Sequence, residues 1–272
     1  MNQTFDRLTL KNPATFHGKG LHSGLTTSVT IAPSDNGLQL KYNSQTIACS
    51  AENVTDTRRC TSIGPVSTVE HLMSALAGLG ITDAIISVEG NPEMPALDGC
   101  SHEFVLGLMD ASVVKCGEMD IEGPFARVYE KGDDFSVAIA VGSGSWRYTF
   151  DLGARWPGIQ DFEFQFNLAN YIKEISHART FALSEEMDWI KENGLGQGLD
   201  ENSAFVIGPD GYINKTRFMD EPARHKLLDL IGDIYLSGVP PKAINVVATK
   251  TGHTANIEMA KKLATHVKIT RR

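Results

Sequence analysis

The chain has 272 residues, enough for one large domain or two ordinary ones, and its 42% hydrophobic and 21% charged residues are typical of a soluble globular protein. This composition argues against wholesale disorder. The formal net charge of −8 argues against broad nucleic-acid binding, although a local cationic cluster could still hold an anionic ligand.

The sequence carries no sign of secretion or membrane insertion. Its four cysteines form no CxxC pair and are expected to be ordinary thiols in a reducing compartment. The N-terminal MNQTFDRLTL lacks the apolar core of a signal peptide, and no stretch approaches the ~18 continuous apolar residues of a membrane-spanning helix. We therefore expect a cytoplasmic protein with no transmembrane segment.

The first half is predicted to start with strands and to end in the order helix, strand, loop, helix. Residues 27–33 and 37–43 are alternating or β-branched runs joined by the turn sequence Ser34-Asp35-Asn36-Gly37. A helix should begin near Ser67, because apolar residues then recur at helical spacing until glycines follow. A strand over about 83–88, an irregular loop and a helix from Ser101 complete this half.

The second half is predicted to follow a boundary at Glu122-Gly123-Pro124, since the residues from Val113 onward show only weak periodicity. Further on, Gly142-Ser143-Gly144 predicts a hairpin between two strands. Three strands are predicted at 134–141, 145–152 and 161–166, followed by a short helix at 184–193 and a long helix at about 222–238. A strand at 243–249 and a last helix from about 254 end the chain.

The two halves therefore end in the same order of elements. Each long helix also carries a histidine near its start, His71 in the first half and His225 in the second. Together these features indicate an internal duplication with weak sequence similarity. We expect an α+β fold of two units, with the two histidine-bearing helix ends meeting between them.

The most informative candidate site lies on the long helix of the second half. His225 and Asp229 are four residues apart, so on a helix they share one face with Cβ atoms about 5–6 Å apart, and Asp233 continues that face. A histidine and a carboxylate at this spacing can chelate a divalent metal, preferably zinc. The alternative is an ordinary surface His–Asp pair.

The corresponding helix of the first half offers a third ligand. His71 is preceded by Glu70, a carboxylate that could act on a water, and two histidines with one aspartate leave the open position that catalytic zinc needs. The alternative is structural, because Ser67 and Glu70 have the spacing of a capping box. Neither HExxH nor HxxEH is present, which argues against the zinc peptidases with those signatures.

Three further segments carry weaker signals. His253 follows Gly252 at a predicted strand-to-helix turn, where a functional side chain is easily presented. The Thr180 hydroxyl could donate to a developing oxyanion or could simply cap a turn. The segment 18–24 has three glycines but lacks the ending of a phosphate-binding P-loop, so it is interpreted as a tight connection that positions His22.

Taken together, the sequence is similar to one known family along almost its whole length. The matching strings are GKGLHSG, STVEHLMSALAGLGI, PEMPALDGCSHEFV, ARTF, RHKLLDLIGDIYL and TGHTANIEMAKKLA. They resemble UDP-3-O-acyl-N-acetylglucosamine deacetylase, the zinc enzyme family of lipid A biosynthesis, in the family's order from about residue 7 to 266.

The resemblance implies two α+β domains, over residues 1–120 and 124–272. Each would be a β-sheet with two helices, and the helices would lie between the two sheets. An insertion in the second domain, at about 182–207, would form a hydrophobic passage for the substrate's acyl chain, with Leu183 among its apolar residues. Family members commonly carry Gly-Gly-Ser where this chain has Gly198-Leu199-Asp200, a departure that concerns the shape of this passage.

The resemblance also implies roles for individual residues. His71, His225 and Asp229 would bind Zn²⁺, or Fe²⁺ at the same ligands. Glu70 would be the general base, and His253 would stabilise the oxyanion and protonate the leaving amine. The remaining roles implied are Asp233 orienting His253, Thr180 donating to the oxyanion, Lys226 contacting the diphosphate, Phe181 lining the sugar or acyl site, and His22 lying near the pocket.

The implied function is removal of acetate from the 2-N-acetyl group of a UDP-linked 3-O-acyl glucosamine. Two alternatives remain at this point: deacetylation of another N-acetyl sugar, and a non-catalytic lipid- or nucleotide-sugar-binding protein. A decayed enzyme would be expected to lose at least one of the metal and acid–base residues, and all are present. We expect a monomer that does not bind nucleic acid, since no segment has the pattern of a dedicated oligomerisation helix.

Overall fold

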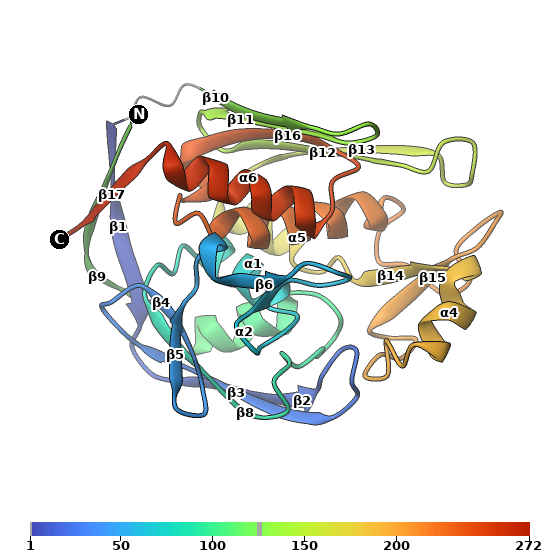
Figure 1. Ribbon diagram of the computed structural model, residues 1–272, viewed down its shortest axis with the longest axis horizontal. Coiled ribbons are helices and arrows are strands. Elements are labelled where there is room, and N and C mark those ends of the chain that lie inside the picture. Colours follow the sequence, from blue (N-terminus) through green and yellow to red (C-terminus); the bar gives the residue numbers. More distant parts are fainter. Residues whose placement is uncertain (1, 124–126) are drawn as a thin grey trace.

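The computed structural model describes residues 2–123 and 127–272 and contains two similar units (Figure 1). The first sheet has, in spatial order, β2 (Ala14–Lys19), β3 (Thr26–Pro33), β8 (Ala84–Gly90), β4 (Leu38–Tyr42) and β5 (Gln45–Ala48). The second sheet has β10 (Arg127–Lys131), β11 (Ser136–Val141), β16 (Ile244–Thr249), β12 (Ser145–Asp151) and β13 (Ile159–Gln165). In both, the central strand is antiparallel to one neighbour and parallel to the other. This shared topology confirms the predicted α+β fold of two sheet-and-helix units.

The helices lie between the two sheets, as Figure 1 shows. They are α1 (Glu70–Leu79) and α2 (His102–Asp110) in the first unit, and α5 (Glu221–Tyr235) and α6 (His253–Thr265) in the second. The hydrophobic core fills the space between sheets and helices, and its largest fully buried side chains include Trp146, Tyr148 and Phe104. Among the described residues, no helix is long and apolar enough to cross a membrane.

Helices α1 and α5 cross at close range. Gly232 lies at the crossing, where a Cβ atom would be only 2.1 Å from the backbone oxygen of Glu70. A residue with a side chain would therefore push the helices apart. The close approach brings the start of α1 beside the middle of α5, and this contact buries the polar face of α5 that the sequence alone left open to solvent.

The predicted hairpin at residues 142–144 is wrong. Strands β11 and β12 are not paired, because β16 lies between them and bonds to both. The turn is closed by that inserted strand, since the backbone N–H groups of Ser143 and Ser145 both donate to the side-chain oxygen of Asn245 (3.0 and 2.9 Å). The glycines specify a chain reversal, but the strand that returns much later in the sequence determines the pairing.

A third sheet, in the order β1-β9-β17, joins the two units at the side where both chain ends lie (Figure 1). Its antiparallel strands are β1 (Asn2–Leu10), β9 (Val113–Glu122) and β17 (Lys268–Arg271). Strand β9 was not predicted because its first six residues include no fully buried side chain; only Met119 and Ile121, near its end, are buried, so the alternation is short. Of the predicted boundary, Pro124 lies outside the described residues, and the division into domains at 120 and 124 stays a prediction.

Each unit also carries an insertion. The first contains β6 (Val54–Asp56) and β7 (Ser62–Ile63). In the second unit, α3 (Leu168–Asn170) follows β13. The insertion comes after it and contains β14 (Thr180–Leu183), α4 (Met187–Glu192) and β15 (Ala204–Ile207), with β14 and β15 paired in parallel. We call residues 180–207 the second insertion; it projects from one side of the molecule, opposite the third sheet (Figure 1). Single helical turns η1 to η4 cover Ala51–Asn53, Tyr171–Ile175, Ser184–Glu186 and Pro241–Ala243.

Candidate active site

A cavity of about 480 Å³ opens where the two units and the second insertion meet. Its polar end is formed by the first turn of α1, the face of α5 that meets it, and the start of α6. Its apolar end is formed by the second insertion. The residues at the polar end are Glu70, His71, His225, Lys226, Asp229 and His253.

The geometry at the polar end fits a divalent cation. Nε2 of His71 and Nε2 of His225 lie 3.6 and 3.5 Å from Oδ1 of Asp229, and one ligand atom from each residue lies within 4.8 Å of the others. Asp229 Oδ1 is buried and has no hydrogen-bond partner. Since buried carboxylate oxygens are almost always satisfied, an unpaired oxygen facing two imidazole nitrogens is what a cation ligand set would leave. The alternative of a surface His–Asp pair is wrong, because both side chains are buried.

Neighbouring groups hold these candidate ligands in the protonation states that can bind a metal. His225 Nδ1 donates to the Ala178 carbonyl oxygen (3.1 Å), which leaves Nε2 with a lone pair toward the centre. Burial lowers the pKa of His225 to about 3, so its imidazole is neutral. Burial alone would raise the pKa of Asp229, but the charge of Lys226 holds it well below its usual range, and Lys226 Nζ donates to the other carboxylate oxygen (2.9 Å).

Glu70 lies beside the ligand group at the first residue of α1. Its Oε2 accepts a hydrogen bond from the backbone N–H of Thr61 (2.9 Å), and burial raises the pKa of its carboxyl group. The structural alternative of a capping box is wrong: α1 begins at Glu70 itself, no side chain caps it, and the carboxylate accepts from Thr61 rather than bonding back toward Ser67.

His253 lies at the first residue of α6 and is fixed by a buried carboxylate. Its Nδ1 donates to Asp233 Oδ2 (2.9 Å), which leaves Nε2 as the nitrogen available to the cavity. Burial alone would lower the pKa of His253, but the charge and hydrogen bond of Asp233 raise it to about 9. The imidazole is therefore protonated at neutral pH.

Two residues that complete this network were missed in the sequence. Thr61 donates from its hydroxyl to Asp233 Oδ1 (2.6 Å), so one residue contacts both Glu70 and Asp233. Asn256 donates to Asp233 Oδ2 (2.9 Å). Asn256 follows His253 by three residues on one helix face, a signal that could have been used, whereas Thr61 lies in the insertion of the first unit and carries no local signal.

The other predicted site residues lie around the cavity with one exception. His22, Thr180 and Phe181 line it, and the backbone N–H of His22 is held by Glu93 Oε1 (2.6 Å). Leu183 packs against the hydrophobic core rather than in the lining.

Arg59 is a further missed residue of the lining. Its guanidinium lies 4.6 Å from the centre of the Trp189 ring and pairs with Glu186 (3.1 Å). It therefore connects the insertion of the first unit to that of the second across the cavity.

The apolar end of the cavity is built almost entirely from the second insertion and the segment after it. Its lining includes Ala182, Met187, Ile190, Leu195, Leu199, Ala204, Phe205, Val206 and Ile213. Leu199 and Asp200, which depart from the common Gly-Gly-Ser, both belong to this lining. A cavity with one polar and one long apolar wall suits a ligand that has a polar head and a hydrocarbon chain.

Buried histidines and an aspartate that fit a cation, with a carboxylate and an imidazolium beside them, are typical of metal-dependent hydrolases. Comparison with known proteins specifies the family. The sequence model of the family LpxC, UDP-3-O-acyl N-acetylglycosamine deacetylase, matches residues 7–265.

Relatives named UDP-3-O-acyl-N-acetylglucosamine deacetylase match over most of their length. The protein from Nostoc sp. is 34% identical, covering 94% of this chain and 97% of its own. The protein from Geobacter sp. strain M21 is 35% identical, covering 94% and 88%, and that from Cellvibrio japonicus is 35% identical, covering 91% and 86%. The chain belongs to the UDP-3-O-acyl-N-acetylglucosamine deacetylase family and is a hydrolase, which confirms the resemblance found in the sequence.

Proposed function

We propose that this protein removes the N-acetyl group from UDP-3-O-acyl-N-acetylglucosamine, releasing acetate and a free amine for lipid A biosynthesis. The observation that carries the proposal is the unpaired, buried oxygen of Asp229 facing His71 and His225, with Glu70 and His253 lining the same cavity. Family membership supports the substrate class.

His71, His225 and Asp229 would hold the metal ion, Zn²⁺ or Fe²⁺. When bound there, the ion would polarise the acetyl carbonyl and lower the pKa of the attacking water. The protein contributes a neutral imidazole at His225 and an ionised carboxylate at Asp229, the protonation states that ligands need.

Glu70 is the proposed general base. It takes a proton from water as the water oxygen bonds to the acetyl carbon. Its burial brings the pKa of the carboxyl group upward from the ordinary value, which makes it a stronger base than an exposed glutamate. The Thr61 N–H fixes one carboxylate oxygen and so sets the direction of the other.

His253 is the proposed acid. As an imidazolium it stabilises the developing oxyanion and then gives its Nε2 proton to the sugar nitrogen as the carbon–nitrogen bond breaks. Asp233 keeps it protonated and orients the ring. The Thr180 hydroxyl is a second donor to the oxyanion, Lys226 and Phe181 contact the substrate, and the apolar end of the cavity takes the acyl chain.

The test is acetate release from UDP-3-O-acyl-N-acetylglucosamine by purified protein, before chelation, after chelation and after addition of Zn²⁺. We expect release to stop on chelation and to return with the metal. UDP-N-acetylglucosamine without an acyl chain is the matched substrate. Equal turnover of both would favour a deacetylase of another N-acetyl sugar, and no release from either by zinc-loaded protein would contradict the proposal.

A further inference from the structure

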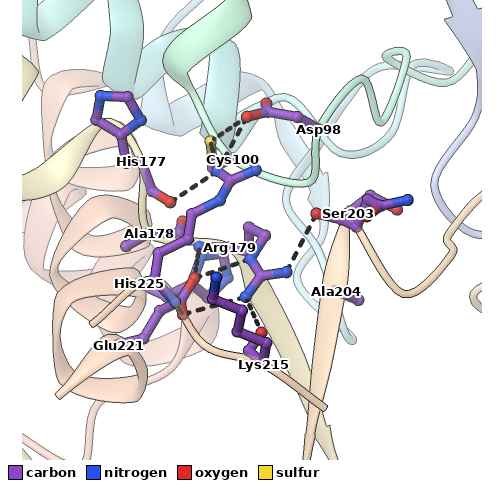
Figure 2. A network of polar contacts seen from close by, with 12 residues as sticks. Asp98, Cys100, His177, Ala178, Arg179, Ser203, Ala204, Lys215, Glu221 and His225 are labelled. Carbon is purple, nitrogen blue, oxygen red and sulfur yellow. Dashed lines mark hydrogen bonds and ion pairs between the residues drawn. The ribbon is translucent and has the colours of Figure 1, made fainter. Parts of the chain in front are cut away.

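A buried ion pair lies at the base of the second insertion, outside the catalytic group described above. The side chains of Arg179 and Glu221 are 4% and 0% exposed, and Arg179 Nε lies 3.0 Å from Glu221 Oε1 (Figure 2). Arg179 directly precedes β14, and Glu221 is the first residue of α5. The pair therefore connects the start of the second insertion to the helix that carries two of the three metal ligands.

Arg179 also holds the chain where the insertion returns. Its Nη1 donates to the carbonyl oxygen of Asn202 (3.1 Å), and Nη2 donates to that of Lys215 (2.8 Å). Glu221 in turn accepts from the backbone N–H groups of Arg179 (3.0 Å) and Arg217 (2.6 Å). One guanidinium thus fixes the loop before β15, the segment after it and the first turn of α5, as Figure 2 shows in part.

The residues on either side of Arg179 belong to the site itself. The carbonyl oxygen of Ala178 accepts the hydrogen bond from His225 Nδ1, and Thr180 lines the cavity. A shift of the backbone at Arg179 would therefore move the acceptor that orients a metal ligand and the proposed oxyanion donor together. Glu221 lies one turn before His225 on the same helix, so it constrains that ligand from the other side.

Burying two charges is costly, and a buried ion pair is by itself weak evidence for stability. Its fixed geometry is a better explanation of its presence, because the planar guanidinium directs its donors along set lines in a way that an ammonium group does not. The chain offers a comparison in the pair Arg7–Asp83, which is also buried (2.6 Å) but ties the third sheet to the first unit, away from the cavity.

We propose that Arg179 and Glu221 are positioning residues for deacetylation, fixing the second insertion, Thr180 and the Ala178 carbonyl relative to His225. The proposal rests on the proposed deacetylase function for its kinetic readout only. If the proposal holds, metal affinity and turnover depend in part on two residues at the base of the second insertion, which forms the apolar end of the cavity.

The test compares Arg179→Lys and Glu221→Gln with Arg7→Lys. For each protein, Zn²⁺ affinity is measured by competition with a chromophoric chelator, and kcat, KM and melting temperature are determined. We expect both site variants to lose about 10–100-fold in Zn²⁺ affinity and in kcat, as loss of a group that orients a metal ligand does. Arg7→Lys should lower the melting temperature and leave Zn²⁺ affinity and kcat unchanged.

The proposal is overturned if the site variants behave like Arg7→Lys, less stable but with wild-type Zn²⁺ affinity and kcat. If Arg179→Lys does not fold, Glu221→Gln decides, because it keeps the size of the side chain and an oxygen acceptor. If the wild-type protein releases no acetate, the proposed function fails, and the Zn²⁺ affinities still decide the positioning role.

Discussion

Two buried histidines of the site have opposite pKa shifts, and their neighbours explain why. Burial acts on both in the same direction, lowering the pKa. At His225, burial and the charge of Lys226 outweigh the raising effect of Asp229, and the pKa falls to about 3, whereas at His253 the charge and hydrogen bond of Asp233 outweigh burial, and the pKa rises to about 9. When the surroundings move the pKa values of two identical side chains in opposite directions, the two residues are suited to different roles, here a neutral metal ligand and a charged acid.

The general-base role predicts the behaviour of Glu70→Gln. The amide keeps an oxygen acceptor for the Thr61 N–H but cannot take a proton, so the fold and the metal ligands should persist. We expect kcat to fall by about 10²–10⁴-fold, the usual contribution of a general base, with Zn²⁺ content unchanged. Metal analysis and single-substrate kinetics measure both, and the exposed Glu89→Gln is the control. Near-wild-type kcat would remove Glu70 from this role.

The acid role predicts the alkaline limb of the pH–rate profile. The pKa of His253 is raised from 6.5 to about 9, so its charged form persists through neutral pH and is lost as the pH rises through about 9. Activity should fall over that range. In Asp233→Asn the charge that raises the pKa is gone, and the limb should move to lower pH. kcat/KM measured against pH tests this, with the exposed His266→Ala as control; an unshifted limb in Asp233→Asn would contradict the assignment.

Much of the candidate site was predictable at the residue scale because it follows local spacing. His225 and Asp229 share a helix face by their separation of four, and the adjacent pair Glu70-His71 lies at a helix start. What spacing could not predict is the set of contacts made across elements. Thr61 and Arg59 reach the site from the insertion of the first unit; Thr61 precedes Glu70 by nine residues but is 172 residues from Asp233, and nothing in the immediate sequence of either residue distinguishes it from an ordinary surface residue.

At the scale of elements, the sequence predicted which helices and strands exist better than it predicted how the strands pair. The helices begin within about three residues of the predicted positions, the usual uncertainty of boundaries. The hairpin failed because β16, which is distant in sequence, lies between β11 and β12. Gly232 was likewise uninformative alone, since its function depends on a second helix that approaches its Cα.

The second insertion carries a prediction about acyl-chain length. Leu199 lines the apolar end of the cavity, and its side chain packs near Gly196, where a Cβ atom would be 3.9 Å from Leu199 Cδ1. Leu199→Ala removes three carbon atoms from the wall and should admit longer chains. We expect the ratio of kcat/KM for long over short acyl substrates to rise by about tenfold, since one methylene is worth 10-fold or more in such pockets.

The control for this variant is Lys191→Ala, an exposed residue of α4 in the same insertion but outside the cavity lining. It should leave the order of acyl-chain preference unchanged. If both variants, or neither, change the preference, Leu199 does not determine the length of chain that the passage accepts.

At the scale of the whole molecule, the candidate metal centre is shared between the two units. His71 comes from the first unit, and His225 and Asp229 come from the second. The duplication was visible in the sequence because each half repeats the same order of elements. The third sheet was not visible in the sequence. Its strands come from both ends of the chain and from the segment between the units, and only folding brings them together.

A shared centre predicts that metal binding stabilises the molecule as a whole. At a hundredfold excess over Kd, binding to the folded state alone adds about 2.7 kcal/mol, which raises the melting temperature by roughly 5–10 °C in a protein of about this size. Chelation should therefore lower the melting temperature of the wild-type protein, and added Zn²⁺ should bring it back to the original value. His71→Ala should lose most of that shift, because His71 is the one of the three proposed ligands that the first unit contributes, whereas Glu70→Gln should keep it. An undiminished shift in His71→Ala would mean that the ion binds elsewhere and does not link the two units.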